Sequence, residues 1–138
     1  MIVFVDTSTL LAASWSAKGL SRLLITQAAK AGWTLVTADY CLSEVEKNVR
    51  KHPAGASDWR AVIRPGLKSV GSVYVFDRPI IFDATKDRPV ILSAIGSDAD
   101  YLVTSDMADF AHLLGTIVYG VKVRTPKSFL LEMDVIEG

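Results

Sequence analysis

Along this chain, short apolar runs rich in β-branched residues alternate with longer segments in which apolar residues recur every three or four positions. The short runs occupy residues 2–5, 33–37, 73–76, 100–104 and 121–124. Strands that alternate with helices form a mainly parallel sheet with helices on both faces. We therefore expect an α/β fold, a three-layer sandwich around a mainly parallel sheet of about five strands, in a single domain over residues 1–138.

Helical segments are expected between these runs, and prolines mark some of their ends. A short helix is predicted to start at residues 10–13, and a second, with its apolar positions at residues 20–28, to end at Gly32. Further helices are predicted at residues 39–51, 59–70, 87–97, 107–114 and 126–133, with a loop at residues 77–86. Pro65 predicts a kink or a break within its helix. Pro126 follows Thr125 and predicts the first position of the last helix.

Composition excludes several classes of protein. Half of the 138 residues are hydrophobic, which allows one buried core and excludes global disorder. Fifteen basic and fifteen acidic residues exclude a uniformly basic surface. The single cysteine, Cys41, cannot form an internal disulfide or a cysteine metal cluster. Neither a membrane span nor a secretory signal is apparent, so a cytoplasmic protein that does not bind membranes is expected.

Acidic residues recur where the predicted strands end. Asp6 directly follows the first strand, and Asp106 lies two residues after the fourth. Further acids follow other strands or open a helix, namely Asp39, Asp77 and Asp87. The carboxyl ends of parallel strands meet at one edge of a sheet, where ligands bind. Clustered carboxylates need a proton or a cation, and hard oxygen ligands favour Mg²⁺ or Mn²⁺.

Four segments of the sequence combine strands and helices with acidic residues at particular positions, and together they form a recognisable order. An acid closes a strand in residues 2–13 (IVFVDTSTLLAA), and a second lies on a helix in residues 42–49 (LSEVEKNV). Residues 86–106 open a helix with an acid and end in Thr-Ser-Asp, and residues 121–130 join a strand to a proline-initiated helix. In this order the chain resembles the PIN-domain nucleases, the VapC-like toxin ribonucleases and their relatives, over nearly its whole length.

The resemblance implies a PIN-like fold and a catalytic, metal-binding tetrad of Asp6, Glu44, Asp87 and Asp106. We expect Asp6 and Asp106 to bind the principal Mg²⁺ or Mn²⁺ ion, and Glu44 and Asp87 to bind through water or at a second site. Thr104 and Ser8 are expected to hydrogen-bond a carboxylate or a bound water, as auxiliary residues. Glu46 competes with Glu44, because the apolar stripe of this helix does not fix which of the two faces the site.

The activity that the resemblance implies is a metal-dependent endoribonuclease, with the toxin of a toxin–antitoxin pair as a plausible role. Its expected partners are an RNA substrate, a small antitoxin protein and a second copy in a homodimer. Residues 20–28 and the region of Trp15 are either such a protein-binding surface or ordinary core.

Charge is unevenly distributed along the chain. Residues 47–68 contain six basic residues and one acid, whereas residues 77–109 contain three basic residues and seven aspartates. The basic segment either holds phosphates beside the acidic site or is simply solvated. Single-stranded or looped RNA is the expected substrate. Tyr40 and Trp59 are candidates for base stacking, and core packing is the favoured alternative for Trp59.

Three other functions are open to this sequence. A receiver-type phosphoacceptor module would use Asp77, Thr104 and Lys122, although it needs an acidic pair after the first strand. A haloacid-dehalogenase-type phosphatase needs a second aspartate where Ser8 stands. A PIN fold without activity would serve as a binding or scaffold protein. His52 and His112 have no nucleophilic partner in the sequence and are expected to be packing or surface residues.

Overall fold

The computed structural model describes residues 1–71, 88–106 and 110–138. These residues form a sheet with the strand order β3-β2-β1-β4-β6-β5. Every neighbouring pair is parallel except β5 and β6. The strands are β1 (Ile2–Val5), β2 (Thr34–Ala38), β3 (Leu67–Val70), β4 (Tyr101–Val103), β5 (Ile117–Val118) and β6 (Val121–Arg124). The predicted α/β architecture with a mainly parallel sheet is confirmed.

Strand β1 lies in the middle of this sheet because its residues are apolar on both sides. Val3 pairs with Leu35 of β2 and with Tyr101 of β4, and Val3, Phe4 and Val5 are fully buried. A strand buried on both faces has a continuous apolar sequence, as Ile2–Val5 does. The chain leaves β1 at Asp6 and β4 at Thr104, so both residues lie at the same edge of the sheet.

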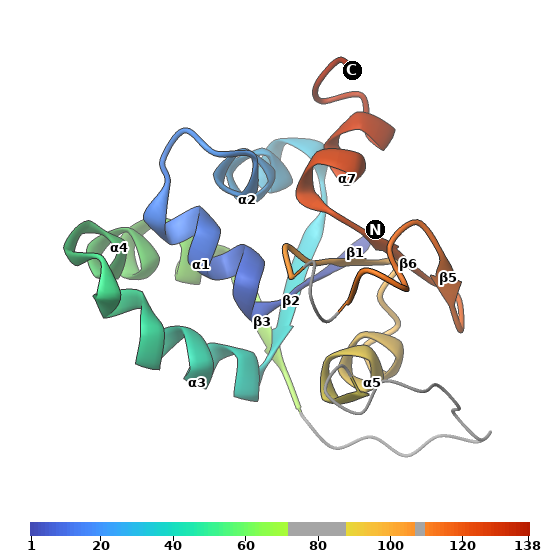
Figure 1. The fold of residues 1–138 in the computed structure, drawn as a ribbon, viewed down its shortest axis with the longest axis horizontal. Helices are drawn as coiled ribbons and strands as arrows, with labels where there is room; N and C mark the ends of the chain where they lie inside the picture. Colours follow the sequence, from blue (N-terminus) through green and yellow to red (C-terminus); the bar gives the residue numbers. More distant parts are fainter. Residues whose placement is uncertain (72–87, 107–109) are drawn as a thin grey trace.

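Helices cover the two faces of the sheet in separate layers, as Figure 1 shows. One face packs against α1 (Thr7–Trp15), α2 (Leu20–Ala31) and α7 (Pro126–Glu132). The other face packs against α5 (Arg88–Gly96). Helix α3 (Asp39–Asn48) contributes to both cores, through Val45 on the first side and Cys41 on the second. The three-layer sandwich expected from the sequence is therefore present.

The segment after α3 differs from its prediction. A 3-10 turn (Val49–Lys51) and α4 (Pro53–Asp58) follow α3, and then a π-helical turn (Trp59–Ile63) and a second 3-10 turn (Arg64–Gly66) lead into β3. The prediction of helix over residues 59–70 is wrong for its last part, which is an edge strand. Pro65 causes the break because it lacks a backbone N–H and its ring clashes with a continuing helix.

The other predicted elements agree with the structure where they can be compared, apart from two helices. Helix α1 begins at Thr7 rather than at residues 10–13, and residues 111–114 of the predicted helix 107–114 form a turn. Thr125 caps α7, accepting from the Ser128 backbone N–H at 3.0 Å, so Pro126 opens the last helix as expected. Strand β5 was not predicted. The predicted strand 73–76, the loop 77–86, Asp87 and residues 107–109 lie outside the described residues. Among the described residues, no helix has the length and apolar character that crossing a membrane requires.

Candidate active site

Asp6 is the central residue of the candidate site, and hydrogen bonds fix both of its carboxylate oxygens. Its side chain is 4% exposed. Oδ1 accepts from the Ser8 hydroxyl at 2.8 Å and from the Thr9 backbone N–H at 3.1 Å. Oδ2 accepts from the Thr104 hydroxyl at 2.5 Å. Asp6 is thus also the N-cap of α1, so its structural role and its candidate chemical role coincide.

Thr104 joins the ends of β1 and β4. Its side chain is fully buried, and its hydroxyl accepts from the Asp106 backbone N–H at 3.1 Å while donating to Asp6. The Ser8 hydroxyl in turn accepts from the Ser105 backbone N–H at 3.0 Å. Thr104 and Ser8, both predicted auxiliary residues, therefore connect Asp6 to the segment that carries Asp106.

A pocket of about 390 Å³ opens at this edge of the sheet. The residues that line it come from α1, α3 and α5 and from the segments that follow β1 and β4. They are Asp6, Thr7, Ser8, Leu11, Tyr40, Glu44, Asn48, Val90, Asp106 and Phe110. Three of the four predicted tetrad acids thus lie around one pocket although they are far apart in the sequence. Asp87 is outside the described residues, and Val90, three positions later, lines the pocket.

The two glutamates of α3 have different surroundings. Glu44 lines the pocket, whereas Glu46 accepts a hydrogen bond from the indole N–H of buried Trp59 at 2.6 Å. The hydrogen bond holds the Glu46 carboxylate against Trp59, so the structure favours Glu44 as the glutamate of the site. Trp59 is 1% exposed and is a core residue rather than a base-stacking surface.

We expect Glu44→Gln to lower any metal-dependent cleavage by tenfold or more, by analogy with the roughly 10–100-fold effects of groups that support a metal site. Glu46→Gln is the matched control. It should leave cleavage nearly unchanged and cost about 1 kcal/mol of stability, through the weaker bond to Trp59. Cleavage rates and thermal unfolding of both variants test this assignment, and equal losses of activity would contradict it.

Burial and hydrogen bonding shift the pKa of Asp6 in opposite directions. Burial raises the pKa of the Asp6 carboxyl, and the hydrogen bonds from Thr104, Thr9 and Ser8 partly offset that rise. Burial also raises the pKa of the Tyr40 hydroxyl, with smaller contributions from Cys41, Glu44 and Asp6. Tyr40 therefore remains a neutral hydrogen-bond donor at the pocket.

The donor chemistry of the pocket fits a hard divalent cation. Its described lining contains the carboxylates of Asp6, Glu44 and Asp106 and no Lys, Arg or His side chain. Carboxylates gathered around one pocket repel each other, and a bound cation relieves that repulsion. Within residues 1–71, 88–106 and 110–138, no three His, Cys, Asp or Glu side chains are grouped closely enough to hold a metal directly. An ion that keeps several of its waters, as Mg²⁺ does, suits this looser arrangement.

The sequence predicts no role at this pocket for Asn48, and it names Tyr40 only as a candidate for base stacking. Tyr40 and Asn48 lie four positions before and after Glu44 on α3, and both line the pocket with it. Helical spacing would have identified them once the orientation of Glu44 was known. Asn48 also donates to the Glu44 backbone carbonyl at 2.8 Å.

Of the residues that a receiver-type module would need, the two that the structure describes, Thr104 and Lys122, are not part of the lining of this pocket. Thr104 donates to Asp6, and the Lys122 ammonium lies 5.3 Å from the centre of the Tyr101 ring and is absent from the pocket lining. Asp77 lies outside the described residues.

Comparison with known proteins supports the fold. No family model matches the sequence, and no curated protein matches it. Among solved structures, the chain is similar to a chain of VapBC2 from Rickettsia felis, which was crystallised bound to a DNA fragment from their promoter. The TM-score is 0.62 at 15% sequence identity, over 91% of this chain and 98% of the other. This chain therefore has the fold of a component of a VapBC complex.

Proposed function

We propose that this protein is a metal-dependent endoribonuclease that hydrolyses phosphodiester bonds in RNA. One observation carries the proposal. Asp6, Glu44 and Asp106 come from three separate elements and line one pocket at the carboxyl edge of a parallel sheet, with hydroxyl groups that orient Asp6. This is the edge where open α/β sheets bind their ligands. Asp87 is proposed as the fourth acid of the tetrad.

The proposed roles follow from the chemistry of each group. A divalent ion, Mg²⁺ or Mn²⁺, makes a bound water more nucleophilic and offsets negative charge that develops at phosphorus. Asp6 and Asp106 would hold that ion, and Glu44 and Asp87 would bind through water or at a second site. Thr104 and Ser8 keep the Asp6 oxygens in place. Asn48 donates one amide hydrogen to the Glu44 carbonyl and would have its second available for a phosphate or a water in the pocket.

The likeness to a chain of VapBC2 supports a further part of the proposal, in which this protein is a toxin neutralised by a small antitoxin. Growth arrest on expression in a bacterial host would test the toxin role, and its dependence on Asp6 would separate it from overexpression stress. The homodimer stays a prediction, which a measurement of molecular mass in solution tests.

The test of the nuclease proposal is metal-dependent cleavage. The protein is dialysed against EDTA and incubated with single-stranded RNA, and then Mg²⁺ or Mn²⁺ is restored. Cleavage should be absent in EDTA and should return with either ion, because the carboxylates act as ligands rather than as nucleophiles. A single-stranded DNA of the same sequence distinguishes ribonuclease from general nuclease activity. A protein that binds RNA and Mn²⁺ without cleaving would instead be the inactive, scaffold form of the fold.

A further inference from the structure

An exposed aromatic pair lies at the far end of α1 from the pocket. Trp15 leaves 36% of its surface exposed, and its ring meets that of His52 edge-on, with the ring centres 4.6 Å apart. The indole N–H donates to the Val49 backbone carbonyl at 3.0 Å. A Cβ atom added to buried Gly55 would lie 2.4 Å from the Trp15 ring. Trp15 is therefore held rigidly although it is exposed.

Two adjacent helices connect this pair to the pocket. Ser8, Leu11 and Trp15 follow each other on α1 at spacings of three and four, which places them on one face. The first two line the pocket. On the neighbouring α3, Glu44 and Asn48 line the pocket, and His52 follows after one further turn. At 1.5 Å per residue, the distance along α1 from Ser8 to Trp15 is about 10 Å.

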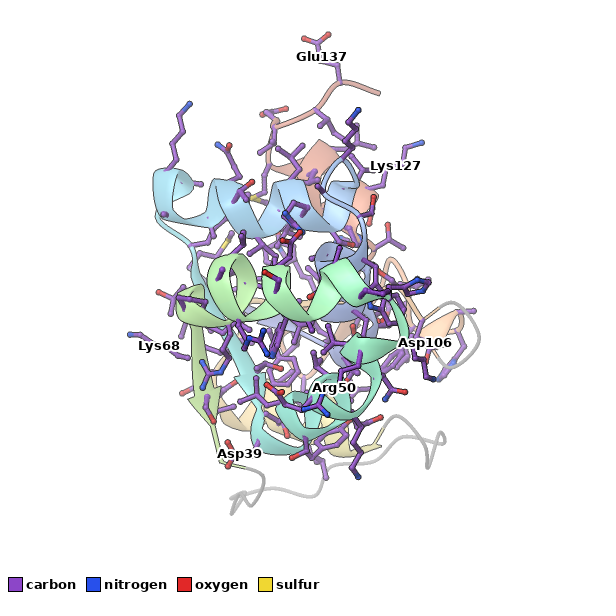
Figure 2. The ribbon with its side chains drawn as sticks, turned by 90° about the vertical axis from the view of Figure 1, so that its left-hand side faces the viewer. Asp39, Arg50, Lys68, Asp106, Lys127 and Glu137 are labelled. Carbon is purple, nitrogen blue, oxygen red and sulfur yellow. The ribbon has the colours of Figure 1, made fainter. Side chains whose placement is uncertain are left out.

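The chain segment that leads into His52 carries three exposed basic residues. Lys47, Arg50 and Lys51 are exposed, and within the described part of the chain none of them forms an ion pair. Asp58, the only acid between residues 47 and 68, is already paired with Arg22 of α2 at 2.8 Å. In Figure 2, Arg50 lies on the face turned toward the viewer, between Lys68 and Asp106.

We propose that Trp15, His52, Lys47, Arg50 and Lys51 form a second contact site for single-stranded RNA, and this inference rests on the proposed function. A length of about 10 Å corresponds to roughly three nucleotides at the approximately 3.4 Å rise of a stacked strand. A strand with its scissile phosphate at Asp6 would thus place a base over Trp15, and its phosphates beside the lysines and Arg50.

The chemistry of the surface favours a nucleic acid over a protein. Stacking on a fixed aromatic ring combined with cations along the backbone is the usual way in which single strands are bound. The indole N–H is already bonded to Val49, so Trp15 offers its ring and no hydrogen-bond donor. Any base can stack on such a ring, and this contact therefore adds affinity without adding sequence preference.

Binding of a labelled 12-nucleotide RNA, measured by fluorescence anisotropy in EDTA, tests the inference without cleavage. Trp15→Leu should weaken binding by about tenfold, and Trp15→Phe by less, because a stacked base contributes in this range. Arg50→Gln with Lys51→Gln should reduce the slope of log affinity against log salt by about 1.4, since each cation contributes about 0.7 on a single strand. Lys30→Gln with Lys127→Gln removes two exposed lysines elsewhere and should leave the slope nearly unchanged.

A second RNA with abasic sites separates stacking from charge. Trp15→Leu should have no effect on its binding, whereas the Arg50 and Lys51 variant should still weaken it. Thermal unfolding shows whether Trp15→Leu remains folded, and the exposed Arg50 and Lys51 allow a test that does not perturb the core. Unchanged RNA affinity in both variants would overturn the inference. So would a dimer that Trp15→Leu converts to a monomer without loss of RNA affinity, because a second copy would then cover this surface.

The outcomes also separate this inference from the proposed nuclease activity. A protein that cleaves RNA with Mn²⁺ but binds it equally well in every variant would refute only the second contact site. A protein that loses RNA affinity in the Trp15 and Arg50 variants but never cleaves would refute only the nuclease.

Discussion

Replacing Asp6 with asparagine should abolish metal-dependent RNA cleavage, with a loss of at least about 100-fold. Asparagine has the same shape but no charge, so it removes the carboxylate that three hydrogen bonds hold at the pocket. Groups that only support a metal ligand typically contribute about 10–100-fold. The loss of a ligand itself should therefore lie at or above the upper end of that range.

The same substitution should leave the fold intact. Asparagine is as good an N-cap as aspartate, so the bond from the Thr9 N–H can persist. It also removes a buried charge whose desolvation raises the pKa of Asp6. We expect Mn²⁺ to raise the unfolding temperature of the unmodified protein and to have little effect on that of Asp6→Asn.

Asp39→Asn is the matched control for Asp6→Asn. Asp39 also begins a helix after a strand and also accepts a serine hydroxyl, that of Ser69, but it is exposed and does not line the pocket. Calorimetric titration with Mn²⁺ and initial cleavage rates should give normal values for Asp39→Asn. Retention of cleavage and of Mn²⁺ binding by Asp6→Asn would contradict the proposed role of Asp6.

The sheet was predictable where a strand is apolar on both faces, and less so at its edge. Ile2–Val5 and Val121–Arg124 have the bounds that their sequences predict. Strand β3, by contrast, has one buried residue, Leu67, followed by exposed Lys68 and Ser69. Its extended conformation comes from pairing with β2, where Leu67 lies beside Leu35. A sequence pattern that considers only near neighbours cannot include that pairing.

Some of the candidate site could be predicted from local pattern, and some required tertiary contacts. Asp6 and Asp106 follow strands, so the rule for parallel sheets was enough to place both at one edge. The choice between Glu44 and Glu46 was open in the sequence, because it depends on Trp59, thirteen positions after Glu46. Once Trp59 enters the core and binds Glu46, Glu44 is left at the pocket. The expectation for Asp87 stays a prediction.

Thr104→Val should reduce both stability and activity, because Thr104 is a positioning residue that acts through Asp6. Valine nearly preserves the shape, but it removes a donor to the buried carboxylate and the acceptor of the Asp106 N–H. The unpaired groups should cost about 1–3 kcal/mol of unfolding free energy. Cleavage should fall by about 10–100-fold, as for other groups that orient a metal ligand.

A pH profile distinguishes this positioning role from a general loss of stability. The bond from Thr104 favours the charged form of Asp6 and lowers its pKa, so its removal should raise that pKa further. Because the carboxylate must be deprotonated to bind a metal, the pH at which Mn²⁺ affinity is half-maximal should move upward in Thr104→Val. Thr104→Ser keeps the hydroxyl and should restore the original profile. If both variants lose stability but neither shifts the profile, Thr104 serves the fold alone and Asp6 does not depend on it for its charge.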